Sequence, residues 1–339
     1  MNHVIEVLIT VPFSEALLNR LREISPRLRI NAIPARKYEE VLEDAWARCE
    51  ILYTDRVLPN PDLVKNLRWI QFHYAGIDFA ADHPLLHNPN LVATTLSGAA
   101  ASQMAEFTVM MLLAISHRLP DLFATQARSE WPRDRFERFL PRELRGDTVG
   151  IIGYGSVGRQ IARLLQPFEV NILAVKRDAM HPEDTGYIIE GLGDPGGDLF
   201  QRLYPVQALN SMLKECDFIV ITIPLTPTTR NLIGAREFAA MKPGAVLIDI
   251  SRGGVVDHNA LTTTLQEKRL GGAALDVFPD EPLPAGSPLW KLPNVIITPH
   301  ISGNSSHYNE RAIALFSENM NRYLVGLPLF NRFDPAKGY

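Results

Sequence analysis

The sequence contains little cysteine and no long apolar segment. Only two of its 339 residues are cysteine, and Cys49 and Cys216 lack the close spacing of a metal site or a redox pair. We therefore expect two reduced thiols in a protein core and no metal centre. The longest candidate membrane segment, Val109–Ile115, has seven uninterrupted apolar residues, whereas a membrane-spanning helix needs about 20. This segment is interpreted as a buried helix, and no membrane partner is expected.

An excess of positive charge is also missing. The formal net charge is -4 and no long basic run is present, so nucleic acid is not an expected partner. The first ten residues, MNHVIEVLIT, lack the basic start of a secretory signal, and we expect a cytoplasmic protein. With 46% hydrophobic and 21% charged residues, the composition is that of a globular protein, and the length suggests about two domains.

What the sequence does contain is two regions in which short apolar strands alternate with helical segments. In the first region the strand-like stretches are IEVLITVP, LRINAIP, EILYTD, LRWIQFHYAG and NLVATTL. In the second region they are TVGIIGY, VNILAVK, DFIVITIP, GAVLIDIS, GGAALDVF and NVIITPH. Strands separated by helix-length segments form parallel sheets with crossover helices, and six nearly continuous apolar strands suit a dinucleotide-binding sheet. We therefore predict an α/β fold with two doubly wound parallel-sheet domains, the second of them a Rossmann domain.

Two helical stretches indicate where these domains begin and end. ASQMAEFTVMMLLAISHRL, which starts at residue 101, is predicted to be a buried helix at the domain junction. Near the C-terminus four apolar residues recur at helical spacing, namely Ile313, Phe316, Met320 and Leu324. This helix follows the last strand of the second region and is expected to pack on the first. We therefore predict a discontinuous domain of residues 1–100 and 305–339, and a second domain of residues 101–304.

The second region opens with a glycine-rich pattern. GIIGYGSVGRQIARLLQPF contains Gly153, Gly155 and Gly158 as G-x-G-x-x-G, preceded by a strand and followed by an amphipathic helical face. The first glycine permits the tight turn, the second lets backbone approach a pyrophosphate, and the third lets helix and strand pack closely. The N-terminus of the helix attracts the phosphate charge. This context predicts a dinucleotide-binding loop.

Four polar residues follow the later strands of this region, namely Arg252, Asp276, Glu281 and His300. The carboxyl ends of parallel strands share one edge of the sheet, so these residues are expected beside the glycine loop. Arg252 offers planar, bidentate donors for a carboxylate, and His300 can exchange a proton near neutral pH. Glu281 would orient the imidazole and favour its protonated form. Each alone has an ordinary structural explanation, but together they fit hydride transfer to the keto carbon of a 2-keto acid beside a nicotinamide.

The chain resembles the D-isomer-specific 2-hydroxyacid dehydrogenases over nearly its whole length. The motifs that carry the resemblance are YAGID at 74–78, GIIGYGSVG at 150–158, PLTPTTRNLI at 224–233, IDISRGGVVD at 248–257, ALDVFPDEP at 274–282 and TPHISG at 298–303. The resemblance implies a flavodoxin-like substrate domain, a Rossmann domain with a catalytic cleft between the two, and a homodimer joined through the Rossmann domain. The implied substrate is a small 2-keto or 2-hydroxy acid of the glyoxylate or hydroxypyruvate type, reduced or oxidised at C2.

Carried over residue by residue, the family's catalytic residues fall on Arg252, Glu281 and His300. The substrate would be bound by Arg252, by His300 and by backbone N–H groups at Ala75 and Gly76. The cofactor contacts fall on the glycine loop and on later strand ends, at Gly153, Gly155, Ser156, Val157, Gly158, Ile223, Pro224, Thr229, Ile250, Ser251 and Asp276.

The chain departs from the family where the second strand of the Rossmann domain ends. VNILAVKRD places Lys176 and Arg177 where an acidic residue commonly binds the ribose 2′-hydroxyl. Two cations would instead attract the 2′-phosphate of NADP, so we predict NADP as the preferred cofactor and NAD as the weaker one. The alternative is a pair of solvated cations at a strand end.

Three features keep two interpretations each. RSEWPRDRFERFLPREL, which contains Trp131, is either a solvated connector or a subunit-contact arm, and the implied homodimer favours the arm. The Gly-rich stretch Tyr187–Tyr204 reads as a surface excursion, either a flap near the adenosine or an insertion. Tyr53, His73 and Tyr74 either line the substrate pocket or serve in packing.

Two other functions compete with the enzyme. A non-catalytic dinucleotide sensor of the corepressor type has the same fold and can retain all three catalytic residues. A formate dehydrogenase relative needs no acid–base group, and the Gln that usually partners its His is replaced here by Glu281. We therefore predict an NAD(P)-dependent D-2-hydroxyacid dehydrogenase that works as a 2-keto acid reductase.

Overall fold

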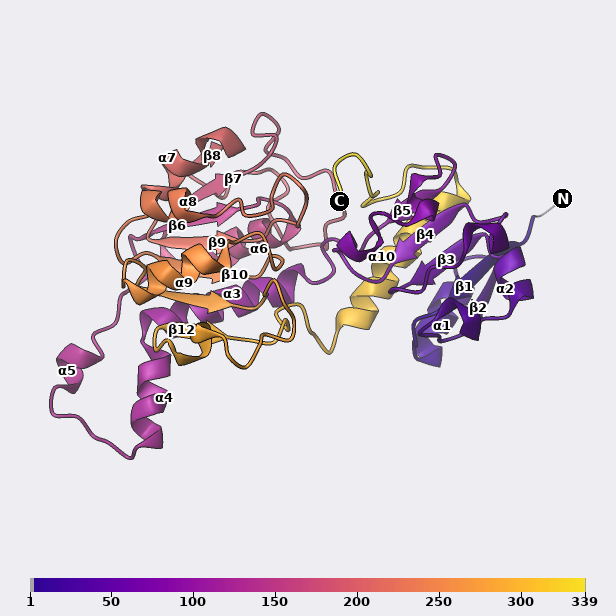
Figure 1. Ribbon diagram of the computed structural model, residues 1–339. Coiled ribbons are helices and arrows are strands. Elements are labelled where there is room, and N and C mark those ends of the chain that lie inside the picture. The colour runs from indigo at the N-terminus through magenta and orange to yellow at the C-terminus, as the bar shows by residue number, and fades with distance from the viewer. Residues whose placement is uncertain (1–2, 339) are drawn as a thin grey trace. The chain divides into compact units, whose positions relative to one another are not determined.

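The computed structural model describes residues 3–338, and the chain divides into two compact units (Figure 1). Unit 1 comprises residues 1–100 and 305–339, and unit 2 comprises residues 101–304. Each unit contains its own parallel β-sheet. The predicted fold class, two parallel-sheet α/β domains, is confirmed.

The sheet of unit 1 has five parallel strands in the order β2-β1-β3-β4-β5. Its strands are β1 Ile5–Ile9, β2 Leu28–Ala32, β3 Ile51–Thr54, β4 Trp69–Phe72 and β5 Val92–Thr94, and its first helices are α1 Glu15–Arg22 and α2 Glu43–Arg48. This strand order is the flavodoxin-like form of a doubly wound sheet, in which ligands bind at the carboxyl ends of the strands.

Helix α10, Tyr308–Leu324, is also part of unit 1 although it follows unit 2 in the sequence. Ile313, Phe316 and Met320 are fully buried in the same hydrophobic cluster as residues of β1 and β3. The ring of Phe316 lies 4.8 Å from that of Tyr53. Helix α10 is therefore part of the core of unit 1. Truncation of a buried Phe such as Phe316 typically lowers the free energy of unfolding by about 3–5 kcal/mol.

The sheet of unit 2 has seven parallel strands in the order β12-β11-β10-β9-β6-β7-β8. They are β6 Thr148–Ile152, β7 Asn171–Val175, β8 Arg202–Tyr204, β9 Phe218–Ile221, β10 Val246–Asp249, β11 Gly272–Leu275 and β12 Val295–Ile297. The six strands expected from the sequence are all present. The edge strand β8 was missed, because it has only three residues and begins with an exposed arginine.

The helices of unit 2 are α3 Ala101–Ser116, α4 Leu119–Ala127, α5 Arg135–Arg138, α6 Ser156–Leu165, α7 Leu209–Leu213, α8 Ala235–Ala240 and α9 His258–Gln266. Short 3-10 turns lie at Tyr38–Glu40, Pro61–Leu63, Asp78–Ala80, Pro84–His87, Gln166–Phe168, Val206–Ala208 and Pro288–Lys291. Figure 1 shows α4 and α5 projecting from the rest of unit 2. Within residues 3–338 no single helix is long and apolar enough to cross a membrane; α3 and α4 pass that test only as a pair bent by 65°.

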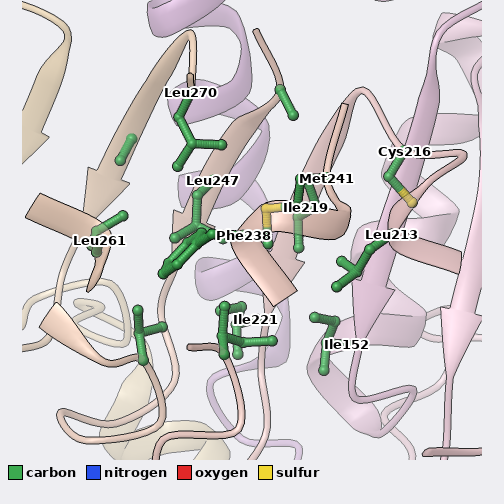
Figure 2. Packing of buried hydrophobic residues seen from close by; sticks show 14 of the residues in the cluster. Ile152, Leu213, Cys216, Ile219, Ile221, Phe238, Met241, Leu247, Leu261 and Leu270 are labelled. Carbon is green, nitrogen blue, oxygen red and sulfur yellow. The ribbon is translucent and has the colours of Figure 1, made fainter. Parts of the chain in front are cut away.

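The two faces of the unit 2 sheet are both buried, as its apolar strands require. Successive residues of β9 pack into different hydrophobic clusters. Ile219 belongs to the cluster shown in Figure 2, and Val220 belongs to the cluster on the opposite face of the sheet. Both cysteines are free and buried, and burial raises the pKa of each thiol to about 12. At neutral pH they are therefore un-ionised core residues.

Candidate active site

The glycine loop joins β6 to α6 and has the geometry of a phosphate cradle. Gly153 has a φ of 106°, and a Cβ there would lie 2.7 Å from the side chain of Ile223. A Cβ at Gly158 would lie 2.2 Å from the carbonyl oxygen of Gly153, so both positions require glycine. A Cβ on Gly155 would meet no atom within 4 Å, which leaves open space beside the N-terminus of α6. This loop fits the pyrophosphate of a dinucleotide.

The β7–β8 crossover, residues 176–201, is bonded to this loop. Tyr154, between the first two glycines, donates its hydroxyl hydrogen to Asp194 Oδ2 at 2.6 Å. Arg159 of α6 is 1% exposed and donates to the carbonyl oxygen of Asp194 at 2.6 Å. Asp194 also accepts hydrogen bonds from the backbone N–H groups of residues 197, 198 and 199. Tyr187–Tyr204 forms no helix or strand before β8, as expected for an irregular surface excursion, but buried polar groups fasten its middle to α6 and its end forms β8.

Lys176 and Arg177 lie at the carboxyl end of β7, as predicted. The Lys176 ammonium donates to the carbonyl oxygen of His181 and, at 3.2 Å, to that of Glu183. Burial lowers the pKa of Lys176, and Arg159 nearby adds to the effect. Lys176 thus holds the start of the crossover, whereas Arg177 is exposed at the same strand end.

The other predicted cofactor residues lie on turns at the same edge of the sheet. Ile223 and Pro224 follow β9, and Ile250 and Ser251 follow β10. The Thr229 hydroxyl accepts from the N–H of Thr226 and donates to the carbonyl oxygen of Pro224, both at 2.7 Å. That hydroxyl closes the turn after β9, so its role there is to shape the backbone.

Glu281 and His300 form a hydrogen-bonded pair. His300 Nδ1 lies 2.8 Å from Glu281 Oε2, and Glu281 Oε1 accepts the backbone N–H of Phe278 at 3.0 Å. His300 Nε2 makes no hydrogen bond with the described residues, and the side chain is 42% exposed. An imidazole with one nitrogen fixed by a carboxylate and the other open is arranged for proton transfer.

Asp276 positions the turn that carries His300. His300 has a φ of 54°, which is uncommon for a residue with a Cβ. Asp276 is 1% exposed, and its oxygens accept hydrogen bonds from the Thr298 hydroxyl at 2.7 Å and from the N–H groups of Ile301 and Ser302 at 2.9 Å. Since both oxygens are engaged within the protein, the side chain holds the backbone around the imidazole.

Arg252 follows β10 on the turn Ser251–Gly254 and is partly buried. Its guanidinium Nη1 donates to the carbonyl oxygen of Ser251 at 2.8 Å. Strands β10, β11 and β12 are neighbours in the sheet. Their carboxyl ends therefore bring Arg252, Glu281 and His300 to the same edge of the sheet as the glycine loop, with β9 lying between β10 and β6.

In unit 1, Ala75 and Gly76 follow β4 in a bend, where Ala75 is exposed and Gly76 is half-buried. Their backbone N–H groups donate to no acceptor within the described residues, so both can receive an anion. The turn is supported from below, since Tyr308 of α10 donates its hydroxyl hydrogen to the carbonyl oxygen of His73 at 2.7 Å. Tyr53 and His73 are buried and hydrogen-bonded to each other at 2.7 Å, so they serve in packing, whereas Tyr74 is 41% exposed.

A comparison with protein-family models decides the family. The model described as "D-isomer specific 2-hydroxyacid dehydrogenase, NAD binding domain" matches residues 109–302, more than half of the chain. The chain belongs to this family.

Among the relatives of this family member, a glyoxylate reductase of Thermococcus litoralis is 33% identical, over 81% of this chain and 80% of that protein. A D-3-phosphoglycerate dehydrogenase of Methanocaldococcus jannaschii is 29% identical over 95% of this chain, which spans 58% of that longer protein. Among solved structures, a D-isomer specific 2-hydroxyacid dehydrogenase of Xanthobacter autotrophicus Py2, in complex with NADPH and MES, has a TM-score of 0.80 and 25% identity, and the alignment covers 99% of this chain and 100% of that one.

Some residues of this dehydrogenase-family site were not expected from the sequence. Asp249, the last residue of β10, is fully buried under the Arg252 turn. Asp194 and Tyr154 join the crossover to the glycine loop. A carboxylate that ends an otherwise apolar strand is the one signal that could have drawn attention to Asp249. Nothing in the composition of the crossover indicates that Asp194 is buried.

Proposed function

We propose that this chain is an NAD(P)-dependent D-2-hydroxyacid dehydrogenase that works as a reductase of small 2-keto acids. The observation that carries the proposal is the Glu281–His300 pair at 2.8 Å, with Nε2 open, at the sheet edge that also carries Arg252 and the glycine loop. A non-catalytic dinucleotide sensor would not require an imidazole held in this way, although it could retain one.

Each residue has a distinct role in the proposed reaction. The nicotinamide cofactor, when bound, supplies the hydride to C2. His300 donates the Nε2 proton to the carbonyl oxygen, and Glu281 holds the ring and stabilises its protonated form. Arg252 binds the substrate carboxylate and polarises the carbonyl. For unit 1, we propose that the N–H groups of Ala75 and Gly76 bind the substrate.

We propose a substrate of the glyoxylate or hydroxypyruvate type. The relatives named glyoxylate reductase that align over most of this chain support this class. The test is a panel of glyoxylate, hydroxypyruvate, pyruvate and bulkier 2-keto acids, each assayed with NADPH and with NADH. Reduction of a small member of the panel is the expected result. Cofactor binding without turnover of any 2-keto acid would favour the sensor, and oxidation of formate would favour the formate dehydrogenase relative.

We propose NADPH as the preferred cofactor. Lys176 and Arg177 place positive charge where the 2′-phosphate of NADP is expected. Lys176 also holds the start of the β7–β8 crossover through its hydrogen bonds to the carbonyl oxygens of His181 and Glu183. A charge-assisted contact is worth about 1.5–3 kcal/mol, which corresponds to about 10- to 100-fold discrimination. Changing Lys176 to Asp together with Arg177 to Ala should reverse the ratio of kcat/KM values for NADPH and NADH. Equal use of both cofactors by the unmodified enzyme at low salt would contradict the preference.

We propose that the enzyme is a homodimer joined through the Rossmann domain, unit 2, with the arm, residues 128–144, in the contact. The arm carries Trp131, Phe136 and Leu140, which are 85%, 76% and 70% exposed. Beside its base lies a hollow of about 370 Å³ lined by residues that include Ser116, Arg142 and Phe218. Exposed aromatic side chains and a neighbouring hollow suit a contact between two copies. Light scattering should show that the parent protein is a dimer, and changing Trp131 and Phe136 together to Ser should weaken that dimer. A monomeric parent protein would contradict a role of the arm in dimer formation.

A further inference from the structure

The hydroxyl group of Tyr154 is a polar group that the packing of the glycine loop does not require. Tyr154 lies between Gly153 and Gly155, is 1% exposed, and belongs to one of the two hydrophobic clusters that pack against the sheet of unit 2. Its ring meets that of Phe200 edge to face at 5.1 Å. A phenylalanine would fill the same space. Because a buried hydroxyl costs free energy unless it is hydrogen-bonded, the partner of this one is part of the structure of the loop.

That partner is the carboxylate of Asp194 in the β7–β8 crossover. The Tyr154 hydroxyl donates to Asp194 Oδ2 at 2.6 Å, and Asp194 is 2% exposed. Burial, and then this carboxylate, raise the pKa of Tyr154, so the hydroxyl keeps the hydrogen that it donates. Burial by itself would raise the pKa of Asp194, but the hydrogen bonds from Tyr154 and from the N–H groups of Leu199 and Asp198 hold it below its usual value. The bond therefore joins a neutral donor to a charged acceptor, which is the stronger kind of hydrogen bond.

Helix α6 holds the same part of the crossover in place. Arg159 is 1% exposed and donates to the carbonyl oxygen of Asp194 at 2.6 Å. Gln160 Oε1 accepts the backbone N–H of Gly193 at 2.6 Å, and Arg163 Nε donates to the Gly193 carbonyl oxygen at the same distance. The Asp194 carboxylate is thus fixed relative to the helix that begins at the glycine loop.

The glycine loop is bonded to the protein on one side and open on the other. The carbonyl oxygen of Gly153 accepts the Thr222 hydroxyl at 2.7 Å, and Tyr154 ties the next residue to the crossover. A Cβ on Gly155 would meet no atom within 4 Å. Since a dinucleotide pyrophosphate would take the open side, the backbone that faces it is positioned through the bonds on the protein side.

We propose that Tyr154 is a positioning residue for the dinucleotide, because its hydrogen bond to Asp194 makes the binding shape of the glycine loop depend on the β7–β8 crossover. Without this bond the loop occupies its binding shape for a smaller fraction of the time, and the apparent affinity falls by that fraction. The pyrophosphate is common to NADPH and NADH, so both cofactors lose affinity by the same factor. Replacement of Lys176 and Arg177, in contrast, should change the preference between the two cofactors.

The test is the binding of each cofactor to Tyr154→Phe, followed by fluorescence in the absence of any keto acid. The Kd values for NADPH and for NADH should both rise about 3- to 10-fold, and by the same factor. Tyr204→Phe is the matched control, because the Tyr204 hydroxyl also donates to a carboxylate at 2.6 Å, that of Glu215, but lies in β8. Its Kd values should equal those of the parent. Unchanged Kd values in Tyr154→Phe, or an equal rise in Tyr204→Phe, would overturn the inference.

A double-mutant cycle tests whether the hydroxyl acts through the crossover. Asp194→Ala should raise both Kd values, and the addition of Tyr154→Phe should then have no further effect. Two effects that multiply would show that the hydroxyl and the carboxylate act independently, which would contradict the inference. If Asp194→Ala does not fold, the comparison of Tyr154→Phe with Tyr204→Phe decides alone.

The inference rests on the cofactor binding that the proposed function requires, and not on keto-acid turnover. A parent protein that binds neither NADPH nor NADH would overturn both proposals. Unchanged Kd values in Tyr154→Phe would overturn this inference and leave the proposed function intact. If the parent binds both dinucleotides but reduces no 2-keto acid, the proposed function alone fails, and the Kd values still decide the role of Tyr154.

Discussion

The two units present their strand ends to ligands in opposite chemical forms. The edge of unit 2 carries ionisable side chains, among them Arg252, Glu281 and His300. The edge of unit 1 offers the backbone N–H groups of Ala75 and Gly76, with buried and uncharged groups beneath them. Burial lowers the pKa of His73 to about 4 and raises that of Tyr53 well above its usual value, so neither carries charge at neutral pH.

This difference between the units predicts which substitutions should reduce activity most. Side chains that exchange a proton or carry a fixed charge are removed completely by one substitution. Backbone donors remain after any substitution, and only their position can be disturbed through the residues that support them. The proposed function therefore predicts large losses from changes in unit 2 and small, binding-type losses from changes in unit 1.

The largest effect is expected from His300→Ala. His300 is the proposed proton donor, so kcat for keto-acid reduction should fall by about 100- to 10,000-fold. Binding of the cofactor, followed by fluorescence, should be retained. His117→Ala is the matched control, because His117 is an exposed histidine of the same unit. A kcat that stays within a few-fold of the parent would remove His300 from the chemistry.

A loss of about 100-fold in kcat/KM is expected from Arg252→Lys. A lysine keeps the positive charge but lacks the planar pair of donors that holds carboxylate and carbonyl together. The same replacement at Arg236, an exposed arginine on α8, should leave the kinetics unchanged. If the lysine variant at position 252 reduces the keto acid normally, the guanidinium does not bind the substrate.

A loss of kcat is expected from Glu281→Gln. Glu281 Oε2 lies 2.8 Å from His300 Nδ1, and the amide removes the negative charge that faces the ring while keeping a hydrogen-bond acceptor. The ring should then be held less firmly in its proton-donating orientation, so kcat should fall, but by less than in His300→Ala, with little change in KM. Steady-state kinetics of the two proteins measure the loss. An unchanged kcat would show that Glu281 does not act on His300.

The smallest effect is expected in unit 1, from Tyr308→Phe. The lost hydrogen bond to the His73 carbonyl oxygen loosens the turn that holds the Ala75 and Gly76 donors. A single such bond contributes about 0.5–1.5 kcal/mol, so KM for the keto acid should rise about 2- to 10-fold with kcat little changed. Tyr323→Phe in the same helix loses a hydroxyl contact to Glu50 instead and serves as the control. A loss mainly in kcat would contradict the contrast between the two units.

The fold could be predicted from the sequence because its determinants are local and repetitive. The apolar strands of both sheets appear as Val- and Ile-rich stretches at helix-length intervals, and Gly153, Gly155 and Gly158 specify one known turn. Strand β8 escaped this reasoning because an edge strand of three residues has no periodicity to detect. A helix or strand could thus be predicted from the sequence wherever its hydrophobic pattern was long enough to recognise.

The site could be predicted less completely, because side-chain partners depend on contacts between distant residues. The sequence places His300 and Glu281 at one edge, but only the structure shows that Nδ1 is the bonded nitrogen. It likewise shows that Asp276 supports the His300 turn and that Lys176 is bonded to crossover carbonyls. Such pairings join residues from 5 to 25 positions apart and have no compositional signature.

The hydrogen bonds of the β7–β8 crossover should limit the local opening of this segment. Gly-rich segments without helix or strand usually exchange their amide hydrogens quickly and are the first to be cut by proteases. Here the amides of Gly197, Asp198 and Leu199 are bonded to the buried Asp194 carboxylate, and Arg159 anchors the same loop from α6. We therefore expect slow exchange and resistance to limited proteolysis at residues 194–199. Opening of this loop should require α6 to loosen, so its exchange rate would report on the glycine loop itself.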